Sequence, residues 1–72
     1  MTTDQLRRAQ RTIPFKPFSV RLADGSRLHV PHPEFLWIHP GGRTAWVATS
    51  DSAADVVDLL LVVAIEIDTE AA

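Results

Sequence analysis

The chain has 72 residues, no cysteine and a formal net charge of −2. This length predicts one domain, and the lack of cysteine excludes disulfides and thiolate zinc sites. The core of so small a domain rarely supplies more than about 3–5 kcal/mol of net stability, so oligomerisation is an expected source of more.

Charge is polarised along the chain. Positions 1–21 hold five of the seven basic residues, and positions 44–72 hold six acidic residues and no Lys or Arg. Charged faces of this kind are usually solvated. Two further interpretations stay open: a basic arm that meets phosphate, and head-to-tail assembly through opposite charges.

The opening segment predicts a short helix over residues 3–12. Thr2 or Thr3 can cap it, and Asp4 lies in the first turn, where a negative charge suits the helix dipole. Leu6, Ala9 and Ile13 fall on one side at helical spacing. The Pro-Phe repeat over residues 14–18 then forces extended backbone, and its two phenylalanines are expected to pack into the core.

A β-hairpin follows the prolines. Phe18, Val20 and Leu22 alternate with polar residues, and apolar alternation resumes after Asp24-Gly25. A three-residue loop, 23–25, puts all the apolar residues on one face, whereas a two-residue loop mixes the faces. This register predicts a left-handed Gly25 and a like-charge pair, Arg21 opposite Arg27.

Pro31 and Pro33 interrupt the strand pattern, because proline lacks the N–H that a ladder needs. Residues 35–38 and 43–49 predict a third and a fourth strand around a turn at residues 39–42. Both faces of this pair are apolar, which is typical of strands covered on both sides. The expected covers are the interior on one side and the helix or a second subunit on the other.

The last third of the chain, residues 55–68, fits two patterns. A helical stripe runs through Val56, Leu59, Leu60 and Val63, and Ser52 could cap it. The many β-branched residues favour a strand over 56–58, a tight turn near 59–61 and a strand over 62–67. We prefer the strand–turn–strand interpretation and keep the helix as the alternative.

Together these elements predict a mainly β fold with a short N-terminal helix. We expect a five-stranded antiparallel small barrel, or a strongly bent sheet, over residues 18–67, with a helix at 3–12 and a tail at 68–72. The longest apolar run, residues 59–65, is too short to span a bilayer. Met1 to Gln10 is polar, so we expect no secretion signal and a cytoplasmic location.

No convergent set of catalytic groups is visible in the sequence. The three histidines, His29, His32 and His39, are the only candidate metal ligands, and an ordinary surface or loop histidine explains each better. Gly41-Gly42 has neither the lysine nor the helix start of a phosphate loop. We therefore expect no enzyme activity, no metal and no cofactor.

The sequence contains basic and aromatic residues of the kinds that bind nucleic acids. Six basic residues could form one face, and Trp37 or Trp46 could stack on bases. The six are Arg7, Arg8, Arg11, Lys16, Arg21 and Arg27. The overall acidity opposes unspecific binding, so RNA or DNA binding is kept as an alternative function.

Four segments carry a resemblance that covers positions 13–67. These segments are residues 14–25, 32–35, 42–44 and 57–62. In this order they resemble a family of short uncharacterised bacterial proteins, which implies no activity. More loosely, a short helix followed by five strands resembles the Sm-like and SH3-like small barrels. That resemblance implies RNA or peptide binding and, for the Sm-like barrels, ring assembly.

The prediction for function is a non-catalytic binding and assembly module. It would self-associate, as a homo-oligomer, through the second apolar face or an exposed strand edge and engage a protein partner. We assign Leu36, Ile38 and Trp46 to that face. The alternative is an Sm-like nucleic-acid binder that uses the basic N-terminal arm.

Overall fold

The computed structural model describes residues 3–67. The elements occur in the order α1 (Thr3–Arg11), β1 (Phe18–Leu22), β2 (Arg27–Val30), a 3-10 turn (Pro33–Phe35), β3 (Leu36–Ile38), β4 (Thr44–Ser50), β5 (Ala53–Asp58), a second 3-10 turn (Leu59–Leu61) and β6 (Val62–Ile67). The predicted tail, 68–72, lies outside the described residues.

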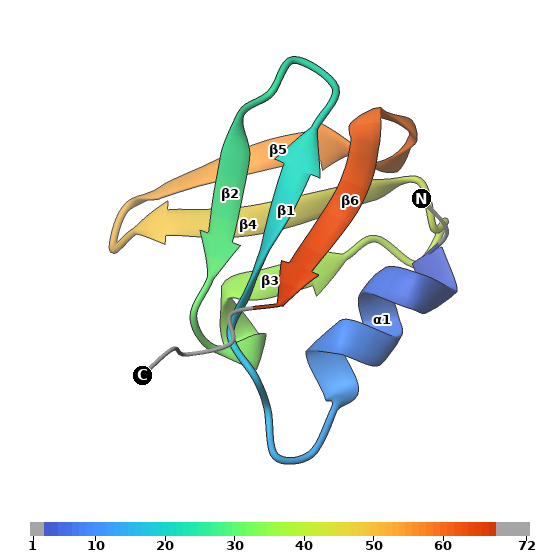
Figure 1. Ribbon diagram of the computed structural model, residues 1–72. Helices are drawn as coiled ribbons and strands as arrows, with labels where there is room; N and C mark the ends of the chain where they lie inside the picture. Colours follow the sequence, from blue (N-terminus) through green and yellow to red (C-terminus); the bar gives the residue numbers. More distant parts are fainter. Residues whose placement is uncertain (1–2, 68–72) are drawn as a thin grey trace.

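The strands form two antiparallel sheets of three, ordered β2-β1-β6 and β3-β4-β5. Figure 1 shows the first sheet lying across the second, with their strands running in different directions. The sheets do not close into a barrel, and residues 3–67 contain six strands instead of the five expected. The two hairpin strands and the predicted segments 35–38, 43–49, 56–58 and 62–67 already number six, so the expected count of five was one too low. Pro33 starts a 3-10 turn that separates β2 from β3.

The β1–β2 hairpin has the predicted register. Phe18 pairs with Val30, Val20 with Leu28, and Arg21 with Arg27. The Leu22 N–H donates to the Ser26 carbonyl at 2.8 Å, and Gly25 has φ 91°. The three-residue loop and its left-handed glycine are therefore confirmed.

Helix α1 is confirmed, with one wrong residue in its apolar stripe. Leu6 is buried and Ala9 packs against the core, but Ile13 is 93% exposed because the helix ends at Arg11. The Gln10 side chain donates to the carbonyls of Pro33 and Leu36, at 3.0 and 2.6 Å. These bonds hold α1 beside β3, as Figure 1 shows.

The segment after β4 follows the preferred interpretation, so the helix alternative is wrong. Strand β5 ends at Asp58, whose carboxylate accepts the Leu60 N–H at 2.9 Å and starts the tight turn. The Ala23 N–H donates to the Leu61 carbonyl at 2.8 Å. The turn therefore directs β6 back to pair with β1, and an apolar run becomes two strands in different sheets.

The core lies between the two sheets and under α1. Its buried residues come from both sheets and from α1. They are Leu6, Phe18, Val20, Val30, Leu36, Ile38, Ala45, Val47, Val57, Leu59 and Val62. Phe15 is partly buried against this core, which agrees with the expectation that both phenylalanines pack inward.

Candidate functional site

Three large apolar side chains form a row on the outer face of the β3-β4-β5 sheet. Trp37 pairs with Trp46, and Trp46 pairs in turn with Val56. Because directly paired residues share a face, the row crosses all three strands. These side chains are 51%, 48% and 54% exposed, respectively. We call this row, Trp37, Trp46 and Val56, the tryptophan face.

Ring contacts fix the geometry of the tryptophan face. The Trp37 and Trp46 rings meet edge to face, with centroids 6.4 Å apart and planes at 79°. The His39 ring packs edge-on to Trp37 at 5.7 Å. Its Nδ1 atom accepts the Gly41 N–H at 2.9 Å, which ties the ring to the turn after β3. The aromatic rings are therefore held in a defined arrangement at the surface.

Charges of both signs lie at one end of this face. Asp58 pairs with Thr44, two residues along the ladder from the Trp46–Val56 pair and therefore on the same side of the sheet. The Arg43 Nε atom lies 3.6 Å from an Asp58 carboxylate oxygen. The face therefore has an apolar centre and a rim that carries a cation and an anion side by side.

The predicted membership of the second apolar face needs correction. Leu36 and Ile38 are 3% and 9% exposed and point into the core, so they cannot lie on an outer face with Trp46. The register decides this, because Trp46 pairs with Trp37, whereas Ile38 pairs with buried Ala45. Trp46 stays in the set, and Trp37 replaces the two aliphatic residues.

Val56 was missed for a related reason. The sequence places it in a strand but does not say which side of that strand faces outward. Only the pairing of Val56 with Trp46 puts it on the tryptophan face. A signal was available for Trp37: a turn at residues 39–42 pairs Trp37 with Thr44, which lies two residues from Trp46 and therefore on the same face of the sheet.

The free edge of the same sheet carries an acidic residue that disfavours strand addition. Asp55 pairs with buried Val47, so it points to the inner side of the sheet, yet it is exposed. The β4–β5 hairpin extends past the other sheet, as Figure 1 shows. Inward-pointing charges on edge strands are a known protection against edge-to-edge pairing. Of the two predicted self-association surfaces, the face is thus better suited than this edge.

The outer face of the β2-β1-β6 sheet is polar. Glu66 lies between the two arginines that oppose each other in the hairpin, with contacts of 3.4 Å to Arg21 and 2.9 Å to Arg27. The Ser19 hydroxyl and the His29 Nδ1 atom are 3.3 Å apart on the same side. The predicted like-charge pair therefore exists and is bridged by one carboxylate.

The structure divides the six basic residues proposed for nucleic acid between elements. Arg21 and Arg27 meet at Glu66 on the β2-β1-β6 sheet. Arg7, Arg8 and Arg11 belong to α1, which packs beside β3 of the other sheet, and exposed Lys16 follows the helix. The tryptophans lie on β3 and β4, so the expected base-stacking residues are on a different sheet from Arg21 and Arg27.

Within residues 3–67, no cluster of three or more His, Cys, Asp or Glu side chains is placed to hold a metal ion. The ring of His32 contacts Phe35 at 5.4 Å, and that of His39 contacts Trp37. Over the same residues, no helix has the length and apolarity needed to cross a membrane.

Comparison with known proteins gives no relative: no protein-family model, curated protein or solved structure matches the chain. The resemblance to short bacterial proteins and to small barrels therefore stays an expectation from the sequence. The features that bear on function are the tryptophan face and the polar outer face of the β2-β1-β6 sheet.

Proposed function

We propose that this protein is a non-catalytic assembly module that self-associates by packing its tryptophan face against the same face of a second copy. The observation that carries the proposal is the row of half-exposed Trp37, Trp46 and Val56 side chains across three paired strands. Aromatic residues gathered at the centre of a patch are typical of protein interfaces and of their energetic hot spots.

The charged rim of the tryptophan face favours a second copy of the chain as the binding partner. Arg43 and Asp58 lie together at one end of the row, so the rim carries both charge signs. A two-fold interface brings each patch against itself, and a patch of mixed sign can then pair Arg43 of one copy with Asp58 of the other. A patch of a single sign would repel its own copy.

The size of the face sets the expected strength. A tryptophan buries about 150–250 Å² in a core, so two half-exposed tryptophans and Val56 offer roughly 250–300 Å². A standard interface buries about 800 Å² per partner. The row can therefore supply the centre of an interface, and we expect a weak, concentration-dependent dimer.

Self-association also supplies what so small a domain lacks. The chain has no cysteine for a disulfide, and the described residues hold no cluster for a metal. Oligomerisation is the remaining common way to stabilise a domain of this length.

Intrinsic fluorescence and sedimentation test the proposal together. Both tryptophans of the chain belong to the row, and the chain has no tyrosine, so the emission reports on this face. Between about 10 µM and about 1 mM we expect a blue shift of the emission and a rising sedimentation mass. The Trp46→Ser variant should raise the dimer dissociation constant at least about tenfold.

Val63→Ser is the matched control. Val63 is as exposed as Val56 but lies in β6 of the other sheet, so its loss should leave the dissociation constant unchanged. A strict monomer over the whole concentration range would overturn the proposal. An equal effect of Trp46→Ser and Val63→Ser would show that the tryptophan face is not the contact.

Nucleic-acid binding has less support. Arg21 and Arg27 share the carboxylate of Glu66, which offsets part of their charge, and the tryptophans lie on the other sheet. This function requires salt-sensitive binding of single-stranded RNA that weakens when Arg7, Arg8 and Arg11 are replaced by alanine.

A further inference from the structure

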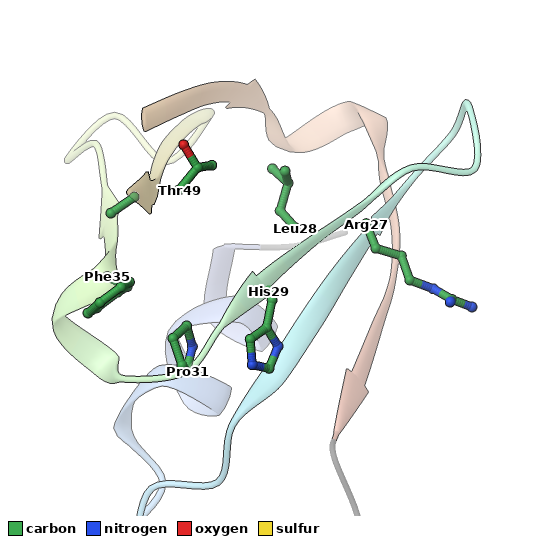
Figure 2. Close-up of a pocket in the computed structure, with 7 residues that line it drawn as sticks. Arg27, Leu28, His29, Pro31, Phe35 and Thr49 are labelled. Atoms are coloured by element: carbon green, nitrogen blue, oxygen red, sulfur yellow. The ribbon is translucent and has the colours of Figure 1, made fainter. Parts of the chain in front are cut away.

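A second surface feature lies beside strand β2. An open cavity of about 250 Å³ lies between β2 and the end of β4. Figure 2 shows Leu28 projecting into it from β2, with Phe35 and Thr49 on the far wall. Arg27 also lines it, and the end of the Arg27 side chain extends outward. None of the tryptophan-face residues lines it, so it is a separate candidate site.

The cavity exists because β3 is shorter than β4. In the β3–β4 ladder Leu36 pairs with Val47, so the next pair would be Phe35 with Ala48. Phe35 belongs instead to the 3-10 turn that begins at Pro33. The end of β4 therefore runs on past β3, and Phe35 and Ala48 become walls of the cavity.

Strand β2 is an edge strand of its sheet and lies beside the cavity. Among the strands in the described part of the chain, β2 pairs with β1 and forms one margin of its sheet. The Leu22 N–H bonds to the Ser26 carbonyl, and bonded and non-bonded pairs alternate in an antiparallel ladder. Arg27, opposite Arg21, is therefore in a non-bonded pair, and its N–H and C=O point away from β1 toward the cavity side.

We propose that this cavity binds an extended peptide segment of a partner protein, in which acidic and apolar residues alternate. The segment adds to β2 as a further strand, a recognised mode of peptide binding in which the main chain gives affinity and alternate side chains give specificity. Its apolar side chains enter the cavity beside Leu28 and Phe35, both of which are partly buried already.

Charge complementarity is the reason for the acidic residues of the proposed peptide. In an added strand, every second side chain continues the outer face of the sheet, next to Arg27. Two arginines there share one carboxylate, so Arg21, Arg27 and Glu66 together carry a surplus positive charge. Acidic side chains at those positions complement that surplus, and lysines would meet repulsion.

The probe is a fluorescein-labelled peptide, Glu-Val-Glu-Leu-Glu, with blocked ends. Fluorescence anisotropy measures its affinity, and amide shifts in ¹⁵N NMR spectra locate it. We expect shifts at Arg27, Leu28, Ala48 and Thr49 that saturate with peptide. A peptide with lysine in place of glutamate should bind at least about tenfold more weakly.

The charge-swapped variant separates recognition from folding. Arg27→Glu puts opposite charges across the hairpin, facing Arg21, so the fold should be retained. It should lower the affinity for the glutamate peptide at least about tenfold and raise that for the lysine peptide. Arg8→Glu, on α1, which contributes no residue to the cavity lining, is the matched control and should change neither.

Backbone pairing is tested on the peptide itself. N-methyl groups on the amides that face β2 should abolish binding, whereas N-methyl groups on the alternate amides should leave it nearly intact. Equal binding by both methylated peptides would overturn strand addition, and shifts at Trp37 and Trp46 instead of the cavity would overturn the site.

Two other occupants are distinguishable without peptide. Shifts of the cavity amides that depend on protein concentration would assign the cavity to a second copy. Shifts of the same amides in an Asp68→Asn, Glu70→Gln variant would assign it to the C-terminal residues of the chain. Either result overturns the assignment to a partner protein, and neither affects the test of the tryptophan face.

Discussion

The outer faces of the two sheets differ sharply although their inner faces are alike. The β3-β4-β5 sheet presents Trp37, Trp46 and Val56 to the outside. The β2-β1-β6 sheet presents Arg21 and Arg27 bridged by Glu66. A solvated outer face with polar residues is the ordinary result for an antiparallel sheet. The β3-β4-β5 sheet departs from this pattern, and its outer face is the one that we propose for self-association.

Inner-face and outer-face residues are also expected to serve different purposes, stability and binding respectively. Inner-face residues of both sheets form one core, and their contribution is to folding. Outer-face residues are half-exposed or exposed, so their loss should affect binding more than folding. Substitutions that compare inner with outer positions test this separation directly.

The largest effect is expected from a pair of sequence neighbours on opposite faces. Leu36→Ala should lower the free energy of unfolding by about 2–5 kcal/mol, because it empties a core position. Trp37→Ala should cost less in the monomer and should mainly weaken self-association. Urea unfolding at low protein concentration measures the first effect and sedimentation the second. A larger stability loss in Trp37→Ala would reverse the assignment of the two faces.

A smaller effect is expected on the polar face. Glu66→Gln leaves Arg21 opposite Arg27 without the bridging carboxylate, and should cost about 0.5–1 kcal/mol because all three groups are partly exposed. Added salt should shrink the difference from the parent protein. Asp51→Asn, in the turn between β4 and β5, is the control for the loss of one negative charge. A difference that persists at high salt would argue against a charge effect.

The smallest effect concerns the hairpin loop beside the polar face. The Ser26 hydroxyl, at 2.6 Å, and the Ser26 N–H, at 2.9 Å, donate to the Asp24 carboxylate and lower the pKa of Asp24 below its ordinary 3.8. The resulting stabilisation is present above that ordinary value and is lost as the pH falls through the lowered pKa of the folded state. Carbon-detected NMR titration should show a higher Asp24 pKa in Ser26→Ala, and an unchanged pKa would contradict this account.

Local features of the sequence were enough to predict several elements. The hairpin register followed from alternation together with Asp24-Gly25, because only one loop length keeps Phe18, Val20 and Leu28 on one face. The turn after Asp58 followed from the β-branched residues on both sides of it. These features depend on neighbours in the chain, so the sequence carries them directly.

The interruption after β2 was visible as two prolines, but its consequence for closure was not. Pro33 stops the ladder, and whether the separated strands still close a barrel depends on how the sheets cross. The same interruption leaves the cavity between β2 and β4, which no pattern in the sequence indicated. Such features arise between segments that are distant in the chain.

The sequence by itself determined that β3 and β4 are apolar on both faces, since side chains alternate along any strand. It did not determine which face would be covered. Both candidate sets are apolar, so burial had to be decided by the register between β3 and β4 and by the packing of the other sheet and α1 onto one side. That packing took Leu36 and Ile38 into the core and left Trp37 and Trp46 outside.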